Sequence, residues 1–96
     1  MSDRQAYVEK FQAKLNQWDS EIENLKAKAA EAQADAKIEY KQQIETLEAK
    51  QEKAQGKLDE LRTAADKQWI DFKYDVEEAY NELNTSIERA MEKLAA

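Results

Sequence analysis

Carboxylates are the most abundant side chains in this sequence that could act in acid–base or metal chemistry. The 96 residues include 21 Asp and Glu but no Cys and no His, so thiol nucleophiles, thiolate metal sites and the commonest general base are excluded. Carboxylates that are close together in the sequence include Glu21 and Glu23, Asp59 and Glu60, and Glu77 and Glu78. Side chains one or two positions apart on a helix do not converge, so we expect these pairs on solvated faces. The sequence predicts no catalytic residue, no metal ligand and no cofactor, and therefore a protein that is not an enzyme.

The elements that carry these side chains are predicted to be long helices. The chain has one glycine and no proline, and 38% of it is charged. Ala, Glu, Lys and Gln dominate, which is typical of coiled coils, and residues 1–96 are long enough for a single structural unit. The sequence therefore predicts an all-α fold without an independent second domain.

The charge and hydropathy of the chain narrow its expected partners and location. A net charge of −6 without a basic block disfavours nucleic acid and makes an anionic membrane surface possible but not favoured. Neither an apolar leader nor a stretch of 18 apolar residues is present, so we expect a cytoplasmic protein.

The clearest pattern is an apolar stripe at steps of three and four, which we call the N-terminal seam. It predicts a helix that winds around a neighbour, and it begins with bulky residues and ends in alanines. Its members are Val8, Phe11, Leu15, Trp18, Ile22, Leu25, Ala29, Ala32 and Ala36.

Beyond the seam the apolar period continues, so we expect one long coiled-coil helix over about residues 3–62. Ser2 and Gln5 fit a capping box at its start. The steps of four from Ala36 through Tyr40 to Ile44 form a stutter that locally unwinds a supercoil. Gln51 then occupies an apolar position, where it either fixes the register or marks a weaker contact.

A second amphipathic helix is expected over about residues 66–94, after a turn near 62–66 where Asp66 could cap it. Its apolar stripe, here the C-terminal face, includes an eleven-residue repeat. The C-terminal face consists of Trp69, Phe72, Val76, Tyr80, Leu83, Ile87, Met91 and Leu94. The turn favours an unequal antiparallel hairpin, and the alternative is one continuous helix of the whole chain.

The N-terminal seam favours self-association, with an antiparallel dimer as the preferred form. If two seams cross between Ile22 and Leu25, Trp18 of one copy faces Ala29 of the other, so that large residues meet small ones. In the same arrangement Glu21 meets Lys28 of the other copy.

The stretch ADAKIEYKQQIETLEAKQEKAQGKLDELRTAADKQW, together with the YVEK start, resembles a family of short bacterial coiled-coil proteins loosely described as stress-response proteins. Where that family often has a Ser-Gly-Asp break, this chain has Ala64-Ala65-Asp66-Lys67. The resemblance implies a helical, non-enzymatic protein with a stress-related role.

Two functions follow as expectations. The first is a self-associating structural or scaffolding protein that uses the N-terminal seam. The second is an amphipathic protein that binds lipid or another apolar surface through residues 69–94, as helices with an eleven-residue repeat can do.

Overall fold

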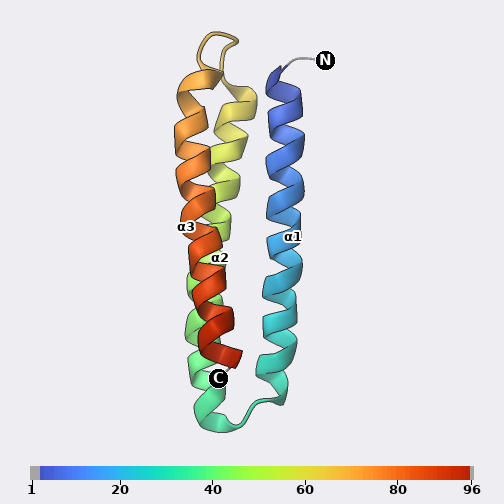
Figure 1. The fold of residues 1–96 in the computed structure, drawn as a ribbon, viewed down its shortest axis with the longest axis vertical. Coiled ribbons are helices and arrows are strands. Elements are labelled where there is room, and N and C mark those ends of the chain that lie inside the picture. The colour runs from blue at the N-terminus through green and yellow to red at the C-terminus, as the bar shows by residue number, and fades with distance from the viewer. Residues whose placement is uncertain (1–2, 96) are drawn as a thin grey trace.

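The computed structural model describes residues 3–95, the side chains of Leu94 and Ala95 excepted, and all of its regular structure is helical. Three helices follow one another: α1 (Asp3–Glu31), α2 (Ala34–Thr63) and α3 (Trp69–Ala95). They form a slender rod with extents of 51 × 19 × 18 Å (Figure 1). The predicted all-α fold is confirmed.

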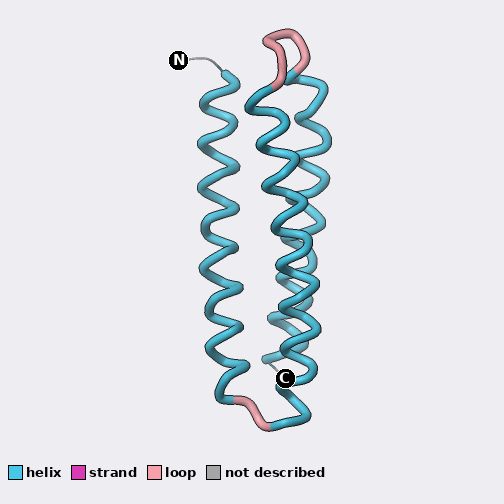
Figure 2. The backbone as a smooth tube through the Cα atoms, turned by 180° about the vertical axis from the view of Figure 1, so that it is seen from behind, coloured by secondary structure: helices cyan, strands magenta, loops and turns pink. Residues whose placement is uncertain are grey.

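The three helices run alternately up and down the rod. Figure 2 shows the two connecting turns at opposite ends, so α1 and α3 are parallel to each other and antiparallel to α2. The start of α1 lies beside the turn between α2 and α3, where the Arg4 guanidinium donates to the carbonyl of Ala64 and to the carboxylate of Asp66. Both neighbours of α2 in sequence are therefore also its neighbours in space.

The prediction of one helix over residues 3–62 is wrong at residues 32–33, where the chain turns back on itself. Gln33 is extended, with φ −71° and ψ 162°, and its side chain does not cap α2. The physical reason is packing. An isolated long helix buries little, whereas folding α1 onto α2 removes the large seam residues from water. From Ala29 onward the seam holds only alanines, which offer a neighbour little apolar area.

The predicted turn between the last two helices is confirmed, so the alternative of a continuous helix is wrong. Helix α2 ends at Thr63, and Ala64 is extended with ψ 156°. The carbonyl of Ala65 then accepts from the amides of Gln68 and Trp69, which begins α3. Asp66 pairs with Arg4, and the helix begins three residues later than predicted. The predicted cap at Ser2 lies outside the described residues.

A continuous apolar core runs along the rod between the three helices. Its fully buried members include Leu15 of α1, Leu47, Leu58 and Leu61 of α2, and Leu83 and Ile87 of α3. Burying a leucine contributes about 1.5–3 kcal/mol, so these side chains account for much of the stability. Gly56 lies within α2 with no other heavy atom within 4 Å of the position a Cβ would take, so it is an ordinary helical residue.

Candidate helix-association surface

The N-terminal seam lies against the rest of its own chain over its bulky half. Phe11, Leu15, Ile22 and Leu25 are buried, and Val8 and Trp18 are half-buried. The alanine half is different, because Ala29 and Ala32 are half-buried and Ala36 is exposed. The residues expected to meet a second copy therefore meet α2 and α3 within one copy.

The C-terminal face also packs into the core. Val76, Leu83 and Ile87 are buried, and the aromatic residues Trp69, Phe72 and Tyr80 are half-buried against them. Met91 is 38% exposed, and the side chain of Leu94 lies outside the described part. Two small residues that the pattern did not single out, Ala79 and Ala90, complete the buried stripe of α3.

Gln51 of α2 joins α1 through a buried polar contact. Its Nε2 donates to the carbonyl of Leu15 and to Oδ1 of Asp19, each at 2.8 Å. Its Oε1 is buried without a hydrogen-bond partner. The buried amide group of Gln51 finds acceptors for its N–H groups in this alignment of α1 and α2. Another alignment would leave those N–H groups buried without acceptors, which costs free energy. Of the two interpretations of this polar seam residue, the structure favours the one in which it fixes the register.

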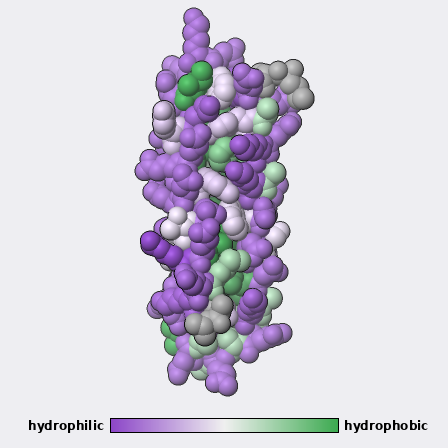
Figure 3. Space-filling view, in the orientation of Figure 1, coloured by the Kyte–Doolittle hydropathy of each residue, from purple (hydrophilic) through white to green (hydrophobic). Residues whose placement is uncertain are grey.

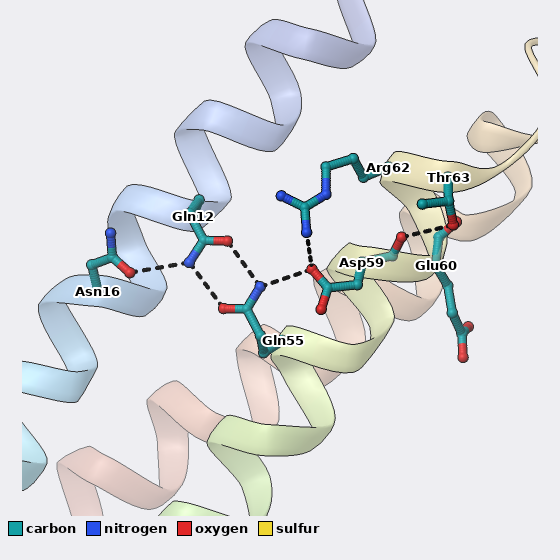
Figure 4. Close-up of polar contacts among 7 residues, drawn as sticks. All are labelled: Gln12, Asn16, Gln55, Asp59, Glu60, Arg62 and Thr63. Carbon is teal, nitrogen blue, oxygen red and sulfur yellow. Dashed lines mark hydrogen bonds and ion pairs between the residues drawn. The ribbon is translucent and has the colours of Figure 1, made fainter.

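A second polar link between α1 and α2 lies one turn further along the rod. Figure 4 shows the side-chain amides of Gln12 and Gln55 donating to each other, with N···O distances of 2.9 and 2.8 Å. Gln55 also donates to Asp59, which accepts from Arg62. These bonds place Gln12 of α1 opposite Gln55 of α2.

Lys26 joins the other end of α1 to α2. Its Nζ lies 3.2 Å from carboxylate oxygens of Glu48 on α2 and Glu23 on its own helix. The hydrogen bond to Glu48, followed by that to Glu23, raises the pKa of this exposed lysine. The pair contributes little to stability because it is exposed. It nevertheless shows that polar contacts to α2 extend along most of α1.

Contacts between α1 and α3 are concentrated near the start of both helices. The ring of Tyr7 lies 4.7 Å from that of Phe11 and 6.2 Å from that of Trp69, and Phe11 meets Tyr80 edge-on at 5.4 Å. The Tyr7 hydroxyl is 3.3 Å from the carbonyl of Lys73. Burial, and then the nearby Glu77 carboxylate, raise its pKa.

Tyr7 was not among the residues predicted to form the interface. Its position one helical turn before Phe11 is the sequence signal that could have identified it.

Further along, α1 and α3 leave an apolar groove of about 460 Å³ between them. Leu25 of α1, Tyr40 of α2 and Met91 of α3 line it, and Glu21 and Lys28 stand at its edge. In Figure 3, hydrophobic atoms come to the surface along this line, in the lower half of a mostly hydrophilic face. Over its second half, α1 is therefore held mainly by α2.

The described residues provide little for other kinds of site. Among residues 3–95 no group of three or more carboxylates is arranged to hold a metal ion, and no helix is long and apolar enough to cross a membrane. Comparisons with models of protein families, with curated proteins and with solved structures find no match. Along α1, the apolar groove is the exposed feature that a partner helix could contact.

Proposed function

We propose that the chain is a non-enzymatic helical protein that works by associating with copies of itself, in a structural or scaffolding role. The observation that carries this proposal is the position of α1. It bears a heptad seam, its aromatic contacts to α3 lie in its first half, and an apolar groove opens beside Leu25 in its second half. A helix with a coiled-coil pattern and an incompletely covered apolar flank is suited to pairing with another helix.

The edge of the groove supports a second copy as the partner. Glu21 and Lys28 have opposite charges and lie two helical turns apart on α1. When two such helices meet antiparallel, each glutamate faces the other copy's lysine, which is the self-complementary arrangement of a twofold interface. An antiparallel dimer is therefore the assembly we propose. The stress-related role that the family resemblance implies, and the cytoplasmic location expected from the sequence, are part of this proposal.

Sedimentation equilibrium of the intact chain tests the proposal. Across a concentration series, the apparent mass should rise from the 11.1 kDa of one chain toward twice that value. Replacing Met91, which lines the groove and is 38% exposed, with serine tests pairing through the groove, because this form of the dimer predicts a weaker rise for the variant. An apparent mass of one chain at every concentration would refute self-association.

Binding to a lipid surface through residues 69–94 is the second candidate. It is favoured by two large apolar side chains on the outer side of α3, Ile70 and Tyr74, which are 58% and 79% exposed. Val76, Leu83 and Ile87 of the C-terminal face are in the core, so α3 would have to leave the bundle to present them. Flotation of the intact chain with anionic and with neutral vesicles tests this idea, and absence of binding to both removes it.

A further inference from the structure

The turn between α1 and α2 lacks the residues that usually make a chain turn. Only Ala32 and Gln33 separate the two helices, and the surrounding stretch, AKAAEAQADA over residues 27–36, contains neither glycine nor proline. Every residue of that stretch except Asp35 is a good helix former. By local preference alone, these residues would continue the helix.

The turn is also weakly held in the folded chain. The side chain of Gln33, which immediately precedes α2, makes no hydrogen bond to the backbone amides at the start of that helix. Ala34, Asp35 and Ala36 are exposed. In a continuous helix the amides of residues 34–36 would bond to carbonyls of the preceding turn instead of to water. Straightening the turn therefore adds backbone hydrogen bonds and removes no buried side chain from the turn itself.

The contacts that hold α1 to α2 join residues on either side of this turn. Arg4 lies beside Ala64 at one end of the pair, Gln12 lies opposite Gln55, and Lys26 reaches Glu48 nearer the turn. Since α1 and α2 run antiparallel, two straightened copies placed antiparallel with their former turns side by side can form the same pairs between copies. No new side-chain chemistry is needed.

We propose that the chain self-associates by exchange of α1: the turn at 32–33 straightens, and α1 of each copy packs on α2 of the other. This inference rests on the proposed self-association, but it replaces the direct pairing of two α1 helices at the groove edge: in the exchanged dimer Glu21 of one copy does not face Lys28 of the other. Each copy then has a single helix over residues 3–63, about 90 Å long at 1.5 Å per residue, against the 51 Å length of the folded single chain. Helix α3 stays on its own α2.

A proline at position 34 separates the two forms. Ala34 is the first residue of α2 and follows the extended Gln33, so Ala34→Pro fits the turned chain. Inside a continuous helix the same proline removes a hydrogen bond and clashes with the preceding turn. We expect Ala34→Pro to raise the dimer dissociation constant by at least about 100-fold. Ala65→Pro, which follows the extended Ala64 in the other turn, is the control and should leave dimerisation unchanged.

Cross-linking between differently tagged copies reports the arrangement directly, because the chain has no cysteine of its own. Gln12→Cys and Gln55→Cys chains are unfolded together, refolded, and treated with a short bismaleimide. Exchange predicts a covalent product that joins one chain of each kind. A parallel mixture of Glu21→Cys and Lys28→Cys chains detects direct antiparallel pairing of two α1 helices through the groove edge.

The outcomes are distinct. A Gln12–Gln55 product that disappears with Ala34→Pro supports exchange. A Glu21–Lys28 product, or a dimer that Ala34→Pro leaves intact, overturns exchange while self-association stands. If no dimer forms in the unmodified chain at any concentration, the proposed self-association itself fails, and exchange fails with it.

Discussion

Gln51 offers the sharpest test of how α1 is held in place. This side chain is 8% exposed, and its Nε2 makes two bonds to α1, to the carbonyl of Leu15 and to the Asp19 carboxylate. Glutamate has the same shape but no amide donors, and at neutral pH it would place a carboxylate against two acceptors. Leucine has a similar volume and no polar group. Comparing the two variants therefore distinguishes the contribution of the hydrogen bonds of Gln51 from that of the volume its side chain fills.

The magnitudes follow from these bonds. Gln51→Glu loses a neutral bond of about 1 kcal/mol and a bond to a carboxylate of about 1.5–3 kcal/mol, so we expect a loss of about 3 kcal/mol in the free energy of unfolding. Gln51→Leu loses the same bonds, but it also removes the buried, unpartnered Oε1, whose burial costs about 1–3 kcal/mol. We expect Gln51→Leu to stay within about 1 kcal/mol of the unmodified chain.

Urea denaturation followed by circular dichroism measures both changes. Burial next to the Asp19 carboxylate should raise the folded-state pKa of a glutamate at position 51. The loss in free energy of unfolding caused by Gln51→Glu should therefore be small below the ordinary glutamate pKa of about 4.3 and should grow as the pH rises above it. If Gln51→Glu at pH 7 is as stable as the unmodified chain, or if Gln51→Leu is the less stable of the two variants, the assignment of Gln51 as an alignment contact is refuted.

The remaining predictions concern the core and the aromatic cluster. Leu15 is 1% exposed, and Leu15→Ala should lower the free energy of unfolding by about 2–5 kcal/mol. Ile38 is 61% exposed, and Ile38→Ala should change the free energy of unfolding by less than about 0.5 kcal/mol. Equal effects of the two variants in urea denaturation would contradict the described core. In an ultraviolet absorbance titration, one of the four tyrosines should ionise well above the ordinary pKa of about 10, and Tyr7→Phe should remove that step. Because the unfolded chain ionises Tyr7 first, the unmodified chain should lose stability as the pH rises above about 10, and Tyr7→Phe should lose less. A titration of Tyr7→Phe that still shows the late step would assign it to another tyrosine.

Much of the fold could be predicted from periodicity. Steps of three and four identified the stripes that become buried, including Leu15 of α1 and Leu83 and Ile87 of α3. The turn after Thr63 could be placed because the apolar period changes there. Periodicity works in these places because the same side chains determine both the local pattern and the tertiary contact.

The turn after Glu31 could not be predicted, because nothing local produces it. The stretch around Ala32 and Gln33 favours a helix, and the chain turns only because α1 gains more by packing on α2 than by continuing. The loss of large side chains after Leu25 and the stutter through Tyr40 mark where the pairing ends. An apolar seam also does not identify the helix that it will contact. The N-terminal seam was predicted to contact a second copy, and in the structure its bulky half contacts helices of its own chain.

The charges show the same dependence on neighbours. Lys53 and Lys57 lie four apart with like charge, as do Glu78 and Glu82, an arrangement that does not stabilise an isolated helix. In the bundle, Lys53 pairs with Glu82 across α2 and α3 at 3.4 Å. Here a neighbouring helix of the same chain supplies the opposite charge.

Small-angle X-ray scattering on chromatographically separated species tests the central claim most directly, because it measures mass and length together. Exchange of α1 predicts a species with twice the 11.1 kDa mass of the chain and a longest dimension of about 90 Å, in equilibrium with a single chain about 51 Å long. A sample that contains only the 51 Å single chain at every concentration, or a dimer no longer than a single chain, would contradict it.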